Sequence, residues 1–301
     1  MYLRKLGRLA LGLLLATVGT AQAQEAALDK IKSEKKIVIM NDLSAAPWQF
    51  RDANGNAAGF SIDLDRMIAA KLDADLNLRN VEWAGLIPGL LTRKSDILAT
   101  SMTVTPKRSE QILFTKEHWY STGVATIVRP EDANVSWEDL NAAGKRIAVK
   151  AGTSSVDIAK QFFTKADIQS YPNDTDTYQA LKTNRVDAAL NDLAVLGVVH
   201  KEYGFVSLKK PRELISQDDW AFAVRPKDAT TQEFLDKFLA EIKQNGQLDV
   251  LRAYWVDSED WKKDFLEKNS GVSEKRKELV KKLGIAAYVP ESGDGKRMTL
   301  E

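Results

Sequence analysis

Short apolar runs alternate along the chain with segments whose apolar residues recur at helical spacing. Residues 37–40 (IVIM) predict a buried strand, and the apolar residues between Leu64 and Leu72 then fall on one face of a helix. Further strands are predicted near 76–83 and 96–100, with a helix between them. This order of strands and helices predicts a parallel sheet covered by helices.

The same pattern restarts after a strand predicted at 123–129. Strands follow at about 146–150, 169–171, 186–190 and 220–225, and helices at about 154–163, 175–184, 192–202, 229–244 and 247–256. We therefore predict an α/β protein of two lobes, residues 24–121 plus 221–257 and residues 122–220, with crossings near 120–124 and 217–222. One doubly wound domain remains an alternative, because periodicity does not assign strands to separate sheets.

Both ends of the chain have patterns of their own. Arg4, Lys5 and Arg8 precede an apolar run at 9–18 and small residues ending at Ala23, which predicts a signal peptide over residues 1–23 and a periplasmic location. Residues 258–301 are rich in charge and predict a C-terminal helical extension, with a helix near 273–283, followed by a mobile tail.

Composition narrows the classes of function. Of 43 basic residues, three precede the predicted cleavage site, which leaves 40 against 42 acidic residues and argues against binding to nucleic acid or anionic lipid. The absence of cysteine excludes disulfides and thiolate metal sites, and His118 and His200 are the only histidines. We therefore expect no metal and no cofactor.

The most informative polar stretch is residues 99–108 (ATSMTVTPKR). A predicted strand ends there, hydroxyls follow at Ser101 and Thr103, and a helix starts at Thr105 and Pro106. Strand ends that meet helix starts are where α/β folds bind ligands, and Arg108 could hold a carboxylate there through two parallel hydrogen bonds. A capped surface helix with a solvated arginine would give the same pattern.

Two later stretches offer related chemistry. Residues 150–157 (KAGTSSVD) predict a strand, a glycine turn and a helix start, where Thr153 could donate to the same carboxylate. Capping alone would also explain Thr153 or Ser154. Residues 185–192 end a predicted strand at Asp192, which could accept from an ammonium group or cap the next helix.

Two tryptophans near strand ends, Trp48 and Trp83, are the best aromatic candidates for the wall of a small-molecule site. A place in the core is the alternative for each of them, since most tryptophans are simply core residues.

Six ordered motifs between Ile37 and Trp255 resemble those of the periplasmic amino-acid-binding proteins of ABC importers, solute-binding protein family 3, and among these most resemble the glutamine-binding proteins. The motifs are PWxF at 47–50, GFxIDL at 59–64, GLIPxL at 85–90, MTVTxxR at 102–108, GTSSVD at 152–157 and TNRxDA at 183–188. The resemblance implies a type II periplasmic binding protein fold, in which two α/β lobes joined by a two-strand hinge close on a ligand.

The resemblance also implies roles for individual residues. Arg108, Thr103 and Thr153 match the clamp on the ligand's α-carboxylate, and Asp192 and Ser101 match the positions that meet its amine. Trp83 matches an aromatic that covers the ligand, and Asp42 and Lys150 match positions that contact its side chain. With Trp48 and Ser154 these are the candidate ligand-binding residues. Ala45 replaces an aromatic stacker of the family and Asn191 replaces a histidine, so the ligand's side chain stays open.

We predict a monomeric extracytoplasmic binding protein that captures a polar amino acid by lobe closure and delivers it to the membrane permease of an ABC importer. No catalytic residue is assigned. One alternative is an enzyme similar to cyclohexadienyl dehydratases, which share this fold and export signal but use a glutamate as proton donor in the region of Asp192. Another is a soluble sensor module that acts on a membrane receptor.

Overall fold

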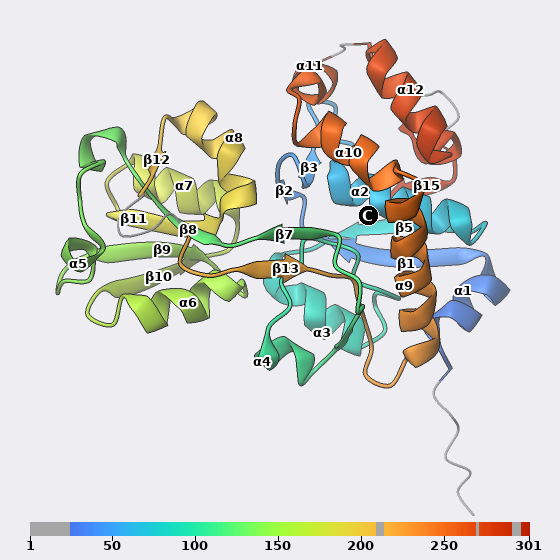
Figure 1. Cartoon of the computed structure of the whole chain (residues 1–301), viewed down its shortest axis with the longest axis horizontal. Helices are drawn as coiled ribbons and strands as arrows, with labels where there is room; N and C mark the ends of the chain where they lie inside the picture. Colours follow the sequence, from blue (N-terminus) through green and yellow to red (C-terminus); the bar gives the residue numbers. More distant parts are fainter. Residues whose placement is uncertain (1–24, 209–213, 269–270, 291–295) are drawn as a thin grey trace, which may run out of the picture.

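The computed structural model describes residues 25–208, 214–268, 271–290 and 296–301, so the predicted signal peptide lies outside the described residues. Two α/β lobes lie side by side and are connected by two extended segments (Figure 1). The strands of each lobe form separate sheets, which rules out the alternative of one doubly wound domain.

The first lobe is built on a parallel sheet in the order β1-β5-β15. Its strands are β1 (Lys36–Asn41), β5 (Asp75–Asn80) and β15 (Met298–Leu300). The strand predicted at 96–100 does not form a full ladder: Ile97 makes a single parallel bridge to Ile39, and Leu98 a single antiparallel bridge to Ala223. The other elements of this lobe are α1 (Ala27–Glu34), β2 (Ser44–Ala45), β3 (Gln49–Arg51), β4 (Ala57–Ala58), α2 (Phe60–Lys71), η1 (Trp83–Gly85), α3 (Leu86–Leu91), α4 (Pro106–Ser109), β6 (Leu113–Phe114), β14 (Ala223–Val224), α9 (Ala229–Gln244) and α10 (Gln247–Trp255).

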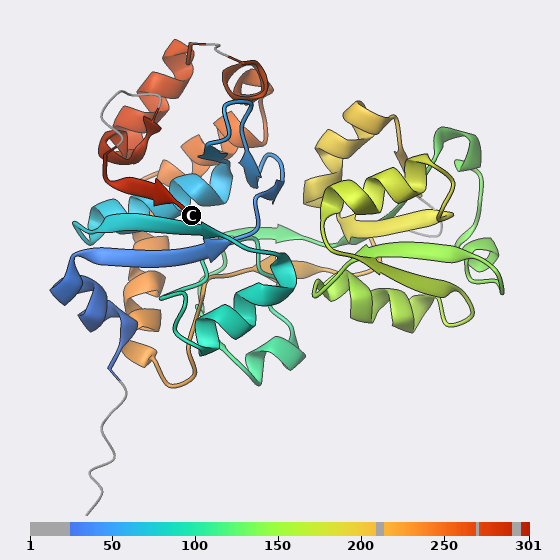
Figure 2. The same cartoon turned by 180° about the vertical axis from the view of Figure 1, so that it is seen from behind.

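The second lobe has a five-stranded sheet in the order β10-β9-β11-β8-β12. Its elements are β8 (Val124–Val128), η2 (Pro130–Asp132), α5 (Trp137–Leu140), β9 (Arg146–Lys150), α6 (Ser154–Phe162), β10 (Asp167–Tyr171), α7 (Asp174–Lys182), β11 (Ala188–Asp192), α8 (Leu193–Tyr203) and β12 (Val206–Ser207). Helices α7 and α8 cover one face of this sheet and share one apolar cluster with it. Helix α6 covers the other face over a second apolar cluster (Figure 2). The carboxyl ends of β9 and β11 therefore lead directly into the starts of helices, or into the turns before them.

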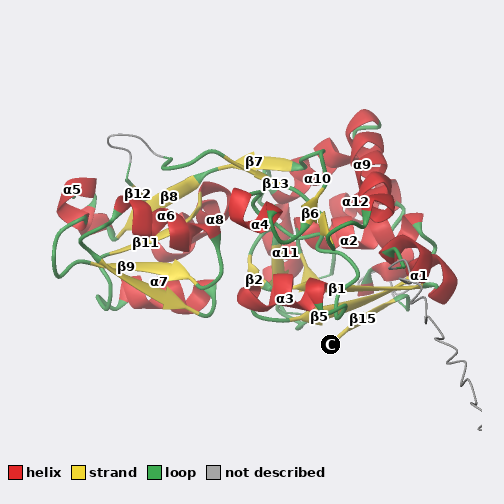
Figure 3. Cartoon of the chain, turned by 90° about the horizontal axis from the view of Figure 1, so that it is seen from below, coloured by secondary structure: helices red, strands yellow, loops and turns green. Residues whose placement is uncertain are grey.

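The hinge consists of β7 (Tyr120–Thr122) and β13 (Asp218–Trp220), which pair antiparallel with Ser121 opposite Asp219. Seen from below, these two strands bridge the space between the lobes (Figure 3). They lie where the sequence predicted the two crossings. Trp220 also bridges to Thr103, so the hinge is tied to the polar stretch that contains Arg108.

The C-terminal extension packs on the first lobe. It contains α11 (Asp260–Leu266), α12 (Glu274–Leu283) and η3 (Ala286–Tyr288), and it ends in β15. The expected helix is present, but the prediction of a mobile tail is wrong for Met298–Leu300, because these residues add a parallel strand to β5. The apolar side chains of α12 also join the main core of the first lobe.

Candidate functional site

A small cavity lies between the lobes beside the hinge. Its lining residues are Ala45, Gln49, Trp83, Ser101, Thr103 and Arg108 from the first lobe, and Lys150, Thr153, Ser154, Asp174, Asn191, Asp192 and Val195 from the second. Eight of the ten residues predicted from the sequence are among them. The free space is only about 20 Å³, little more than a single water requires, so the structure represents a closed arrangement of the lobes.

Direct contacts hold the two lobes together around this cavity. Trp48 Nε1 donates to the carbonyl oxygen of Ala194 at 3.0 Å, and Arg108 Nη2 donates to that of Gly152 at 3.1 Å. At the rim, Lys107 pairs with Asp157 at 3.0 Å. Because these contacts cross the cleft, a ligand can enter only when the lobes separate.

Arg108 is held by the local structure that the sequence predicted. Thr105 caps α4 by accepting from the Arg108 backbone N–H, and Pro106 begins the helix. The guanidinium is buried, and its Nη1 donates to the Thr103 carbonyl at 2.8 Å. Burial lowers the pKa of Arg108 to about 10, so it is still charged at neutral pH. Two bonds to carbonyls leave further N–H donors for an anion, since a guanidinium has five.

The opposite wall is the start of α6. Thr153 Oγ1 donates to the Lys150 carbonyl at 2.7 Å and does not cap the helix, so the alternative of a capping role does not hold for Thr153. Gly152 has φ of +76°, and a Cβ there would come within 2.9 Å of Ala84 Cα in the first lobe. The turn before α6 therefore needs a residue without a side chain for the lobes to close.

We predict that Gly152→Ala weakens ligand binding about tenfold by hindering closure, because it adds a clash between the lobes to the cost of a left-handed backbone. Gly144→Ala is the matched control, since Gly144 also has positive φ, +87°, but has open space around the Cβ position. Calorimetric titration of both variants would separate the two effects. Equal losses of affinity in both would show that the contact with Ala84 does not limit closure.

Asp192 does not cap α8, although it stands at the N-cap position. The Ala194 N–H is bonded at 3.2 Å to the hydroxyl of Thr122 from the hinge, and not to the Asp192 carboxylate. Asp192 Oδ1 is buried and has no hydrogen-bond partner among the residues that the structure describes. Burial, with the nearby negative charge of Asp218, raises the pKa of Asp192 to about 7. The positive charge of Arg108 and the nearby Trp220 indole lower the pKa of Asp192. Trp220 Nε1 itself makes no hydrogen bond to any described residue. The carboxylate is thus available to a donor in the cavity.

Lys150 lies in a buried polar cluster. Its ammonium contacts Asp42 at 3.0 Å and Asp174 at 2.8 Å, and it lies 5.3 Å from the centre of the Trp83 ring. Asp42 also accepts from the Trp83 backbone N–H at 3.0 Å. Asp42 therefore positions its neighbours and does not line the cavity, contrary to its predicted contact with the ligand.

Trp48 is the second predicted residue that the structure does not bring to the cavity. It is fully buried against Phe60 and Trp119 of the first lobe and against Tyr120 and Trp220 of the hinge. It thus belongs to the core, the alternative that the sequence left open.

Sequence reasoning assigned no role to Gln49, Asp174 and Val195, and it noted Ala45 and Asn191 only as departures from the family. Gln49 Nε2 donates to Ser101 Oγ at 2.8 Å, which fixes that hydroxyl at the cavity wall. Asp174 follows Asn173, the N-cap of α7, and an Asn-Asp pair at a helix start gives no separate signal of ligand binding.

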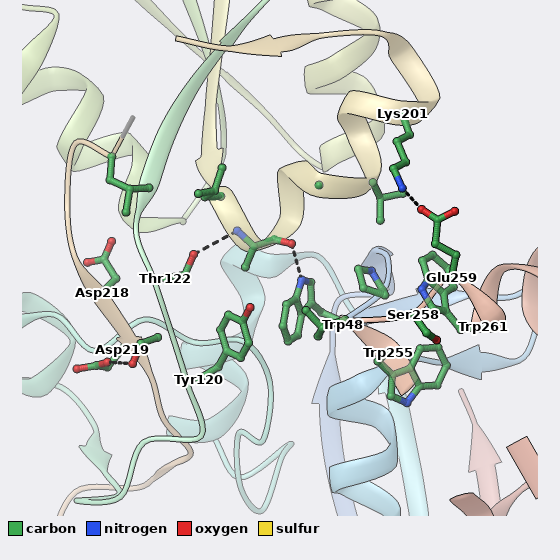
Figure 4. Close-up of a pocket in the computed structure, with 18 of the residues that line it drawn as sticks. Trp48, Tyr120, Thr122, Lys201, Asp218, Asp219, Trp255, Ser258, Glu259 and Trp261 are labelled. Carbon is green, nitrogen blue, oxygen red and sulfur yellow. Dashed lines mark hydrogen bonds and ion pairs between the residues drawn. The ribbon is translucent and has the colours of Figure 1, made fainter. Parts of the chain in front are cut away.

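A larger groove of about 1030 Å³ runs along the hinge, and the bonded pair Trp48 and Ala194 is part of its lining (Figure 4). Tyr120, Asp218 and Trp255 line it, and Lys201 of α8 pairs there with Glu259 of the C-terminal extension. The smaller cavity is the better candidate site despite its size, because it gathers the buried charged groups from both lobes, whereas this groove is open and its ion pair is exposed.

None of the helices in the described ranges is long and apolar enough to cross a membrane. Among curated proteins, the chain is similar to the L-cystine-binding protein TcyJ of Escherichia coli (strain K12), with 24% identity over 255 residues that cover 84% of this chain and 95% of that protein. It is also similar to ABC transporter arginine-binding protein 1 of the same strain, with 27% identity over 212 residues, 69% of this chain and 86% of that protein.

Among solved structures, the chain is similar to the ancestral amino acid-binding protein AncCDT-1, described as a precursor of cyclohexadienyl dehydratase. The TM-score is 0.71 at 29% sequence identity, and the match covers 76% of this chain and 99% of that one. The family model of bacterial extracellular solute-binding proteins, family 3, matches residues 37–258, which include both lobes, the hinge and the cavity. The chain therefore belongs to family 3 of the bacterial extracellular solute-binding proteins.

Proposed function

We propose that this protein binds a polar α-amino acid in the cavity between its lobes and delivers it, in the closed form, to the permease of an ABC importer. One observation carries the proposal: Arg108 of the first lobe and Asp192 of the second face the same buried cavity with opposite charges. No ion pair joins them in the described parts of the chain, although each alters the pKa of the other.

Such an arrangement fits a zwitterion. The α-carboxylate can accept from the free N–H groups of Arg108 and meet the start of α6, where helix N–H groups and the helix dipole favour an anion. The α-ammonium can donate to the unpartnered oxygen of Asp192. Each buried charge then gains the partner that it lacks in the empty cleft, which favours closure over the ligand.

The relatives support this role, since TcyJ is named for binding L-cystine and the second relative for binding arginine within an ABC transporter. The family description, extracellular solute-binding proteins, agrees with the export signal proposed at residues 1–23. None of the described residues of the C-terminal extension lines the cavity.

The proposal is tested by titrating the purified protein with the common amino acids and with analogues that lack either the α-amine or the α-carboxylate. At 100 times its dissociation constant, a true ligand should stabilise the protein by ~2.7 kcal/mol, which a thermal-shift screen detects. Loss of either α-group should weaken binding at least ~100-fold, because one buried charge is left without a partner.

Solution scattering should show a more compact protein with saturating ligand. If none of the common amino acids bound to the protein or made it more compact, the proposal would be contradicted.

A carboxyl group with a pKa near 7 could also donate a proton. Release of an aromatic product from a cyclohexadienyl substrate would therefore support an enzyme instead.

A further inference from the structure

The Lys150 ammonium has no donor left for a ligand. Its Nζ contacts Asp42 Oδ2 at 3.0 Å, Asp174 Oδ2 at 2.8 Å and Ser44 Oγ at 2.9 Å. A lysine ammonium has three N–H donors, so these acceptors from both lobes use all of them. In this closed arrangement all donors of Lys150 are therefore used within the protein, and an anionic side chain would have to compete with two carboxylates for them.

Asp174 is fixed on both of its oxygens. Oδ2 accepts from Lys150 and, at 3.2 Å, from Ser44, and Oδ1 accepts from Asn191 Nδ2 at 2.7 Å. The Asn191 amide also bonds Tyr178, which is buried in α7. Asp174 thus holds one orientation at the cavity wall and keeps the Lys150 ammonium directed to the carboxylates.

The charges of this cluster do not balance. Asp42 and Asp174 bring two carboxylates to one ammonium, and the side chains of all three are at most 5% exposed. Burial lowers the pKa of Lys150, but Asp174 and Asp42 outweigh burial and raise it above its usual value, so the lysine stays charged. The cluster therefore carries a net negative charge where solvent screens it little.

We propose that Asp174 is a specificity residue. It makes the part of the cavity lined by Lys150 and Asp174 select α-amino acids with a neutral or cationic, hydrogen-bond-donating side chain and reject anionic ones. This inference rests on the proposed function, since it assigns the side-chain selectivity of the same cavity. It also changes the role of Lys150: an isolated lysine would favour an acidic side chain, whereas this lysine is neutralised within the protein.

The test compares glutamine with glutamate, because the two differ in charge and hardly in shape, and adds arginine as a cationic probe. Titration calorimetry on the wild type should show glutamate binding on the order of 100-fold more weakly than the better of the other two. Asp174→Asn removes one negative charge and keeps an amide oxygen for Asn191, and it should reduce this ratio at least about tenfold.

Asp176→Asn is the matched control, since Asp176 lies in the first turn of the same helix but is exposed, and its ratio should equal that of the wild type. Asp42→Asn removes the other carboxylate from the opposite lobe and should move the ratio in the same direction as Asp174→Asn. The second variant keeps the test decisive if Asp174→Asn does not fold.

The outcomes separate the two proposals. A wild type that binds no α-amino acid would overturn the proposed function and this inference with it. A wild type that binds amino acids but prefers glutamate would overturn this inference alone. So would an unchanged ratio in whichever of Asp174→Asn and Asp42→Asn is folded.

Discussion

Replacement of Asp192 by asparagine is expected to weaken amino-acid binding by roughly two to four orders of magnitude, as titration calorimetry would measure. The substitution preserves shape but removes the charge that would face the ligand's ammonium. Removal of one partner from a buried ion pair costs ~3–5 kcal/mol, because the other charge is left in a medium that solvates it poorly. Asp167→Asn, an exposed carboxylate on the same sheet, is the control and should bind as the wild type does.

The stability of the empty protein should not fall in Asp192→Asn, since the carboxylate caps nothing. The pKa of Asp192 is raised from 3.8 to about 7 by burial, with a further contribution from Asp218. A raised pKa means that this group's contribution to stability is complete below its unfolded pKa and is lost as the pH rises through about 7. The variant should therefore be at least as stable as the wild type at pH 8. A large drop in its unliganded melting temperature with unchanged affinity would identify Asp192 as a structural residue.

The same carboxylate gives binding a pH dependence. An ammonium ligand needs the ionised form, so affinity in the wild type should decline as the pH falls below about 7, and binding near that pH should release protons. Calorimetry in buffers of different ionisation enthalpy measures this release. Affinity independent of pH between roughly 5.5 and 8 would show that Asp192 is not the partner of the amine.

Replacement of Arg276 by methionine should lower the free energy of unfolding by about 3 kcal/mol, with a melting temperature lower by roughly 6–12 °C. Arg276, in the C-terminal extension, is fully buried, and its Nη2 bonds Asp63 Oδ1 at 3.0 Å. The guanidinium also lies 5.2 Å from the centre of the Phe265 ring. Arg66 and the Trp255 indole still contact Asp63 in the variant. The expected decrease in the free energy of unfolding is therefore at the lower end of the ~3–5 kcal/mol that breaking a buried ion pair costs.

Lys275→Met is the matched control for the extension. Lys275 pairs with Asp260 at 2.7 Å, but both side chains are exposed, so its loss should leave the melting temperature almost unchanged. Thermal unfolding followed by circular dichroism compares the two variants. Equal melting temperatures for Arg276→Met and the wild type would show that the extension is not integrated into the first lobe in solution.

Local patterns determined most of the elements and much of the cavity. The helix predicted at 229–244 is α9, and the strand predicted at 146–150 is β9. Thr105, Pro106 and Arg108 also form the capped start of α4 as expected. These features depend on periodicity, capping and turn chemistry within a few residues, which a sequence displays directly.

Tertiary structure decided which polar residues face the cavity. The sequence left both ligand binding and helix capping open for Asp192. The Thr122 hydroxyl from the hinge bonds the helix start, and Asp192 Oδ1 has no hydrogen-bond partner among the described residues. Asp42 and Lys150 matched positions that contact the ligand, but Asp174 completes a cluster that satisfies Lys150 within the protein. Such partners come from other elements, so no local pattern reveals them.

The C-terminal extension shows the same division. Its charge-rich sequence determined the helix α12, but charge alone is also what an exposed tail displays. Asp63 and Arg276 are 213 residues apart, and only the packing of α12 on the first lobe removes both from water and turns them into a buried pair. The sequence by itself determined the helices and strands and the charges that they carry. The tertiary structure decided which charges are buried together, because burial and pairing depend on residues that are distant along the chain.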